Sequence, residues 1–98
     1  RMVSAAEGRE LGFVNEVVPA ADLMTAARRW AAQICELSPM SIRASKEAVF
    51  KGLDEVSLAA AMAAQMRYPA ISAMLRSEDF KEGPMAFAQK RPPQWKGR

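Results

Sequence analysis

An all-α fold, with one short extended segment near residues 13–18, is predicted by three features of this 98-residue sequence. Small and flexible apolar residues dominate it, with 19 Ala and seven Met. Ser-led capping patterns and prolines divide it into helix-sized lengths. Apolar side chains also recur at intervals of four, three, four and three residues, which draws one stripe along a helix. That stripe is formed by Leu23, Ala27, Trp30, Ile34 and Leu37.

The first element is a short helix opened by a capping box. The hydroxyl of Ser4 can accept from the amide of Glu7, and the Glu7 carboxylate can reach back to the amide of Ser4. Gly12 is a natural residue to follow the end of this helix. Residues 13–18 are rich in Val and stop at Pro19, so a short extended segment is predicted there.

Two long helices follow. The first begins near Asp22 and carries the apolar stripe. Ser38 and Pro39 end it and start the next, with Ser as N-cap and Pro at the first helical position. That helix is predicted to run to about Lys51 and to end at Gly52.

The remaining helices are shorter. Asp54 or Ser57 caps a third long helix, which Pro69 interrupts, because proline removes a backbone hydrogen bond. A shorter helix resumes through Leu75. The acidic pair after Ser77 suits the positive end of a helix, which makes capping the expected role of Glu78 and Asp79 rather than catalysis. A last short helix is predicted from about 82 to 90, before Pro92 and Pro93.

The apolar composition indicates a thin core. Leu, Ile, Val and Phe together supply only 19 of the 98 residues. Ala adds little buried area, and Met fills gaps flexibly. We therefore expect close helix packing that leaves apolar faces able to meet another surface, and self-association as a dimer or trimer.

The titratable residues limit the chemistry. His is absent and Cys35 is the only cysteine, so neither a zinc site, a disulfide nor a histidine general base is expected. A single cysteine and no bilayer-length apolar run favour a cytoplasmic protein with no membrane partner. The sequence begins with Arg1, and no signal peptide is visible.

The net charge of +3 is unevenly distributed. Residues 1–80 hold nine Lys/Arg and ten Asp/Glu, whereas residues 81–98 hold five Lys/Arg and one Glu. This excess of basic residues in 81–98 predicts an anionic partner at that end. Within it, residues 89–98 are named the basic C-terminal segment. The alternative is a solvated tail without a partner.

The order of these motifs resembles the enoyl-CoA hydratase/isomerase (crotonase) family over essentially all 98 residues. The capped first helix is followed by a Gly turn and a Val-rich segment ending in Pro, then by a Ser-Pro break and a helix carrying Lys46. The closing pattern is the most specific, and consists of Ser77-Glu78-Asp79, Glu82-Gly83, Ala86-Phe87 and Lys90-Arg91. A narrower likeness, to the carnitinyl-CoA dehydratase-like branch, rests on Tyr68-Pro69, Glu82-Gly83-Pro84 and Trp95-Lys96-Gly97-Arg98.

The resemblance implies that residues 1–98 are a C-terminal helical domain for oligomerisation and for closing over CoA. The family's ββα spiral, with its oxyanion-hole amides and acid/base carboxylates, would lie upstream and is absent here. No catalytic residue is therefore carried over, and this segment is expected to be inactive alone. The full-length parent would act on an acyl-CoA such as a 2-enoyl-CoA, as a trimer or dimer of trimers. The family resemblance further implies that no metal and no redox cofactor is needed. Family positions for CoA contact match Lys90, for phosphate, and Phe87, for adenine or the pantetheine arm.

Each of these side chains also has a plainer interpretation. Phe87 would otherwise pack in the core, and Lys90 would be a solvated lysine. Arg91 is expected to interact with the helix dipole. Cys35 is expected to be buried and inert, and Trp30 to be packed. Three methionines are expected in the core or an interface: Met62, Met66 and Met74.

Two other functions remain open on the sequence. One is a non-catalytic self-association module, and the other is weak nucleic-acid binding by the basic segment. The second is disfavoured because the charge is short and confined to one end. The sequence defines neither the acyl chain nor the reaction within the family.

Overall fold

A computed structural model describes residues 1–98 and is entirely helical, with no strand. The prediction of an all-α fold is confirmed. The chain forms two compact units, Arg1–Ala32 and Gln33–Arg98. No helix is both long and apolar enough to cross a membrane.

The first unit opens with helix α1, Ala5–Glu10. As predicted, the Ser4 hydroxyl accepts from the Glu7 amide, at 3.2 Å. The Glu7 carboxylate pairs with Arg1, which lowers its pKa most, and a backbone hydrogen bond from Ser4 lowers that pKa further. Gly12 follows the helix end with φ +89°, a conformation that costs glycine little. Residues 13–18 form neither helix nor strand and lead into a 3₁₀ turn, η1, Ala20–Asp22.

Helix α2, Leu23–Cys35, carries the predicted stripe but buries none of its residues. Trp30, expected to be packed, is 41% exposed. Its indole Nε1 donates to Glu16 Oε2 at 2.7 Å, and Arg29 pairs with the same carboxylate. These two donors, the indole first, lower the pKa of Glu16. The indole is therefore held by a polar contact at its tip rather than by enclosure.

The second unit contains four helices: α3, Pro39–Gly52; α4, Leu58–Gln65; α5, Pro69–Arg76; and α6, Glu78–Ala88. Ser38, Ser57 and Ser77 are the N-caps of α3, α4 and α6, and each hydroxyl accepts from an amide three residues later. The break at Pro69 is confirmed, with Pro69 at the first position of α5. These boundaries follow directly from cap and proline chemistry.

The last helix was predicted to start four residues too late. It begins at Glu78, directly after the Ser77 cap, and includes Pro84 within its length. The Ser77 hydroxyl accepts from the Phe80 amide at 3.1 Å, so the cap and the last helix belong to one element. The two acidic residues in the first turn, Glu78 and Asp79, interact favourably with the positive end of the helix dipole.

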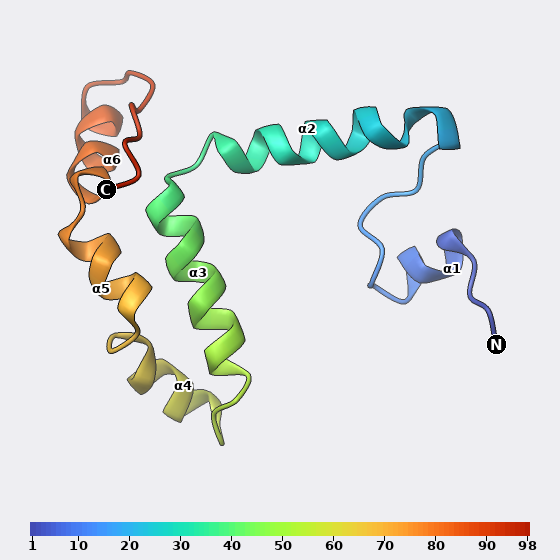
Figure 1. The fold of residues 1–98 in the computed structure, drawn as a ribbon, viewed down its shortest axis with the longest axis horizontal. Coiled ribbons are helices and arrows are strands. Elements are labelled where there is room, and N and C mark those ends of the chain that lie inside the picture. The colour runs from blue at the N-terminus through green and yellow to red at the C-terminus, as the bar shows by residue number, and fades with distance from the viewer. The chain divides into compact units, whose positions relative to one another are not determined.

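Close packing through alanine holds the second unit together. Helix α3 packs against α4 and α5, and α5 packs against α6; the ribbons show α3 and α5 side by side (Figure 1). The core consists of Ala44, Ala64, Tyr68 and Ile71. Small side chains allow the helices to approach, but no large side chain is completely enclosed. The expected thin core is therefore observed.

Many apolar side chains stay exposed. Met62 and Met66 are exposed, whereas Met74 packs against the core. Cys35 was expected to be buried and is instead exposed, because it lies at the end of α2, whose residues are all uncovered. The second unit thus presents apolar faces on α3 and α4 that include Val49, Phe50, Leu53 and Leu58.

Candidate functional site

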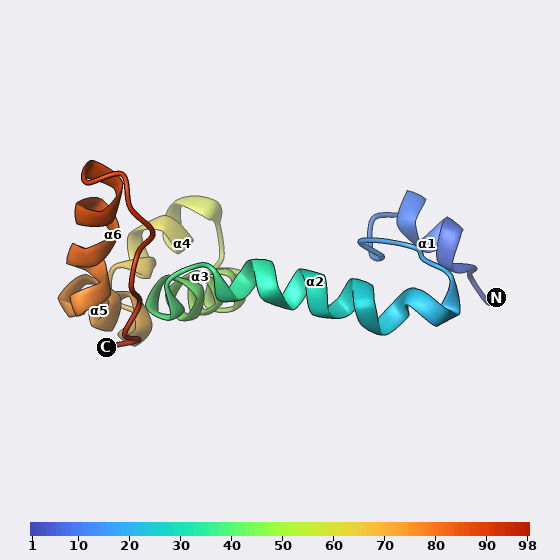
Figure 2. The ribbon, with the colours of Figure 1, turned by 90° about the horizontal axis from the view of Figure 1, so that it is seen from above.

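The basic C-terminal segment folds back along α6 instead of extending into solvent. Figure 1 and Figure 2 show residues after α6 reversing direction and running beside that helix. Three carboxylates on α6 hold the segment, those of Glu78, Asp79 and Glu82. The excess positive charge seen in the sequence is therefore largely compensated.

Glu82 binds the first part of the segment. Its carboxylate accepts from Arg91 Nη1 at 2.6 Å and from Arg91 Nη2 at 3.0 Å, a bidentate pair. It also accepts from the backbone amide of Gln94 at 2.8 Å. The Arg91 guanidinium, followed by the Gln94 amide, lowers the pKa of Glu82 from 4.5 to about 2. Arg91 was expected to interact with the helix dipole; it forms this ion pair because the chain turns back over Glu82.

Asp79 binds the last part of the segment. It is only 3% exposed, and its two oxygens accept from the backbone amides of Lys96 at 2.7 Å and Gly97 at 3.0 Å. The Ser38 hydroxyl donates to it at 3.3 Å. Gly97 has φ +71°, which lets the chain end close against the start of α3 at Pro39. Asp79 lies in the first turn of α6, at the helix start where it was predicted, but Ser77 is the cap and the Asp79 carboxylate anchors the chain terminus.

Glu78 adds exposed pairs at the same end. Lys96 Nζ lies 2.6 Å from its carboxylate, and Arg98 Nε lies 3.4 Å away. Its backbone amide donates to the carbonyl of Arg98 at 2.7 Å. The Lys96 ammonium, the larger influence, and Arg98 lower the pKa of Glu78. Because both partners are solvated, these pairs contribute little to stability.

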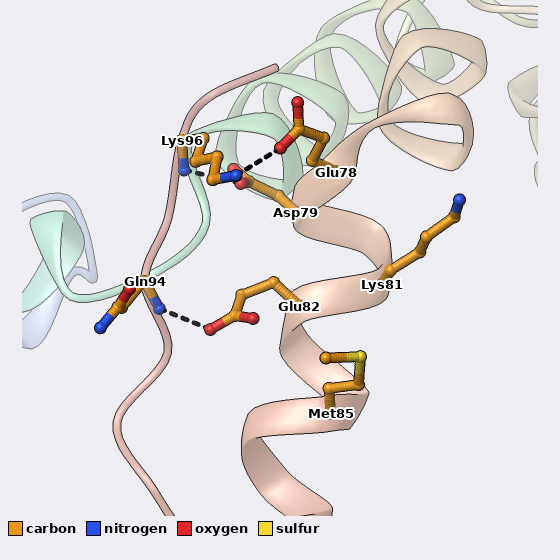
Figure 3. Close-up of a pocket in the computed structure, with 7 residues that line it drawn as sticks. All are labelled: Glu78, Asp79, Lys81, Glu82, Met85, Gln94 and Lys96. Carbon is orange, nitrogen blue, oxygen red and sulfur yellow. Dashed lines mark hydrogen bonds and ion pairs between the residues drawn. The ribbon is translucent and has the colours of Figure 1, made fainter.

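A hollow of about 370 Å³ lies between α6 and the returning segment. Figure 3 shows Glu82 directed at Gln94 and Lys96 directed at Glu78, while Lys81 points away from the segment. The hollow is lined by Glu78, Asp79, Lys81, Glu82, Met85, Gln94 and Lys96. Its carboxylates already have hydrogen-bonding partners within the chain.

Trp95 supplies an aromatic contact in the returning segment. Its indole Nε1 donates to the backbone carbonyl of Glu36 at 2.9 Å. Its ring lies over Gly83, where an added Cβ would stand 3.4 Å from the ring. The Glu82-Gly83 pair of the sequence thus combines an acid that binds the segment with a residue small enough to lie beneath its indole.

The two side chains assigned to CoA lie at the turn between α6 and the segment. Phe87 is 88% exposed, so the alternative of core packing is wrong within this structure. Lys90 is exposed and forms no ion pair, unlike Arg91, Lys96 and Arg98. The amide of Lys90 donates to the carbonyl of Phe87 at 3.1 Å. The structure therefore presents an uncovered ring and an unpaired ammonium on adjacent turns.

Lys90 also adopts an unusual backbone conformation. Its φ is +53°, and Arg91 N donates to Ala86 O at 3.1 Å. Together with the Lys90 to Phe87 bond, this is the Schellman arrangement, in which the left-handed position is usually glycine. A lysine there carries a conformational cost that a glycine would avoid.

No group of three or more His, Cys, Asp or Glu side chains is arranged to hold a metal ion. The paired state of Arg91, Lys96 and Arg98 also removes most of the free positive charge that motivated the nucleic-acid hypothesis.

Comparison with known proteins identifies the family of this chain. The sequence model described as enoyl-CoA hydratase/isomerase matches residues 1–98. The chain belongs to the enoyl-CoA hydratase/isomerase family. Carnitinyl-CoA dehydratases of Proteus mirabilis and Salmonella typhi are each 39% identical over 103 residues, which cover 100% of this chain and 38% of theirs. The chain therefore spans well under half the length of these relatives.

Solved structures of the enoyl-CoA hydratase/isomerase family share the fold. An enoyl-CoA hydratase/isomerase from Mycobacterium paratuberculosis aligns with a TM-score of 0.89 and 35% identity, over 97% of this chain and 36% of that one. A putative short chain enoyl-CoA hydratase from Novosphingobium aromaticivorans aligns with a TM-score of 0.89 and 38% identity, over 98% and 37%. The predicted family membership and its helical crotonase-type architecture are confirmed.

Proposed function

We propose that residues 1–98 act as the C-terminal helical domain of an enoyl-CoA hydratase/isomerase-type enzyme, contributing part of the CoA site and contacts between subunits. Family membership and the 38% coverage of the relatives support this role. The enzyme containing this chain would add or remove water, or shift a double bond, in an acyl-CoA such as a 2-enoyl-CoA. The chain alone would be inactive, because none of its residues matches a catalytic position of the family.

The observation that carries the proposal is the pairing of Phe87 and Lys90. A lysine ammonium is a compact charge suited to a phosphate oxygen. An exposed aromatic ring one turn away offers a flat apolar surface for adenine or for the pantetheine arm. Coenzyme A presents phosphate, purine and an extended arm within one molecule, and so offers a partner for both an ammonium and a ring.

The conformation of Lys90 adds support. A residue held in a left-handed conformation despite its side chain indicates that the side chain has a use that offsets the cost. The neighbouring cations Arg91, Lys96 and Arg98 all pair with α6 carboxylates, so Lys90 is the one cation after α6 without an ion pair. We assign Lys90 to a CoA phosphate and Phe87 to the adenine or pantetheine portion.

The exposed apolar faces support the oligomeric part of the proposal. Phe50, Leu53 and Leu58 are each more than half exposed, as is Met62. Exposed apolar surface of this extent is typical of a protein interface. We infer homo-oligomeric assembly, a trimer or dimer of trimers in the enzyme, with these faces covered.

The proposed CoA contact is tested by the substitution Lys90→Ala in the enzyme that contains this chain. The solvent-screened contact should be worth about 0.4–1 kcal/mol, which corresponds to roughly two- to fivefold in KM. The change should appear in KM rather than kcat, because the phosphate lies far from the reacting carbons. It should vanish with a pantetheine thioester, which lacks the nucleotide.

Lys81→Ala is the matched control, since Lys81, on α6, is also an exposed lysine without an ion pair, and it points away from the segment (Figure 3). It should leave both substrates unaffected. Equal losses with CoA and pantetheine substrates for Lys90→Ala would show that Lys90 supports the fold and does not hold the phosphate.

A further inference from the structure

Lys90 carries the unpaired charge of the turn after α6, and neighbouring residues set the direction in which its side chain extends. The chain leaves α6 through a Schellman turn in which Lys90 takes the left-handed position and Arg91 comes next. A left-handed turn at a non-glycine residue persists only when surrounding contacts hold it. The contacts just beyond the turn therefore decide where the Lys90 side chain can reach.

Glu82 provides the strongest of these contacts. It grips Arg91, the residue immediately after Lys90, through both guanidinium nitrogens at 2.6 and 3.0 Å. Its Oε1 also accepts from Gln94 N at 2.8 Å, which fixes the chain three residues further on. The Glu82 carboxylate thus fixes the residues that follow Lys90, while α6 itself fixes the residues that precede Lys90.

We propose that Glu82 is a positioning residue for the phosphate of an acyl-CoA nucleotide, acting through Arg91 to hold Lys90 in the turn that presents its ammonium. The inference rests on the proposed function of Lys90. The Glu82–Arg91 pair thus has two effects. It holds the turn, and it neutralises Arg91, so that Lys90 is the residue of the turn that presents a free charge. Glu82 itself has no contact with the ligand.

Electrostatics and positioning predict opposite effects for Glu82→Gln. The substitution removes a negative charge and frees the Arg91 guanidinium, so a long-range field alone would strengthen phosphate binding. Loss of the bidentate pair releases the turn, so positioning predicts weaker binding. Glu78→Gln removes the same charge from the same helix and frees Lys96 and Arg98, but it leaves the Arg91 pair intact. It is the matched control.

The experiment uses the 98-residue chain titrated with adenosine 3′,5′-bisphosphate, with adenosine as the ligand lacking phosphate, and follows backbone amide shifts by NMR. We expect Glu82→Gln to weaken bisphosphate binding about two- to fivefold, no more than Lys90→Ala does. Glu78→Gln should leave it unchanged or slightly tighter. Adenosine binding should not change in either variant.

A double variant tests the route through Lys90. Glu82→Gln combined with Lys90→Ala should bind no more weakly than Lys90→Ala alone, because Glu82 acts only through Lys90. Arg91→Gln breaks the same ion pair from the other side and should also weaken bisphosphate binding. It replaces Glu82→Gln as the test if that variant does not fold. Retained or tighter binding in both Glu82→Gln and Arg91→Gln would overturn the positioning role while leaving Lys90 as a contact. Wild-type binding that is absent, or that Lys90→Ala leaves intact, would overturn the proposed function and with it this inference.

Discussion

Replacing Asp79 with alanine should release the C-terminal segment from α6. The carboxylate is 3% exposed and accepts from the amides of Lys96 and Gly97 at 2.7 and 3.0 Å. Hydrogen bonds to a charged group contribute about 1.5–3 kcal/mol each. Both amides regain water when the segment detaches, so the low end of that range applies to each. Asp79→Ala should therefore lower the free energy of unfolding of the second unit by about 3 kcal/mol.

The assay combines urea unfolding, followed by circular dichroism, with amide hydrogen exchange. In the wild type, the amides of Lys96 and Gly97 should be protected, and Asp79→Ala should remove that protection while helical signal remains. Glu78→Ala is the control in the same turn, because its exposed pairs contribute about 0–1 kcal/mol. If Asp79→Ala destabilised the unit no more than Glu78→Ala does, the anchoring role of the buried carboxylate would be refuted.

Three further outcomes follow from the same geometry. The pKa of Glu82 is lowered from 4.5 to about 2, so the stability that its ionised carboxylate gives the fold is fully present above pH 4.5 and is lost as the pH falls toward 2. Hydrogen exchange of the Gln94 amide should accelerate over that range, and unchanged protection would contradict the pairing. Lys90→Gly should be about 1 kcal/mol more stable than Lys90→Ala in thermal unfolding, because glycine accepts φ +53° without strain; equal stability would argue against the left-handed turn. The exposed apolar faces should drive the isolated chain to a dimer or trimer in sedimentation equilibrium, and a monomer at all concentrations would argue against them as an interface.

The helix boundaries were predictable because they depend on local chemistry. A serine hydroxyl three residues before an amide, or a proline at the first turn, acts within a few residues, and the breaks at Ser38 and Pro69 appear where the sequence placed them. The start of α6 was misplaced because the acids after Ser77 were separated from the helix they open.

The arrangement of the C-terminal segment was not predictable from the residues alone. Each carboxylate binds a residue nine to eighteen positions away, across an irregular chain reversal that has no periodic signal. Asp79 looked like a helix-capping residue for this reason. A sequence signal did exist for two of the three acids: Glu78 and Glu82 each have a basic partner after Pro84, so opposite charges on either side of the helix end indicated pairing. Asp79 accepts from backbone amides, for which charge gives no signal.

Burial was the other property that the sequence left undefined. The stripe along α2 has correct helical spacing, yet its apolar residues are exposed, as is Cys35 beside them. Spacing indicates which side chains share a face but not whether another surface covers that face. The same limit applies to Phe87, whose type allowed core packing and whose position at the end of α6 leaves it uncovered.

The central claim is that Phe87 and Lys90 contact the nucleotide end of coenzyme A, and intermolecular NOEs between this chain and CoA test it most directly. We expect NOEs from the Phe87 ring protons to adenine or pantetheine protons. The Lys90 amide shift should saturate at the same CoA concentration. NOEs from CoA only to other residues, with the signals of Phe87 and Lys90 unmoved at saturation, would contradict it.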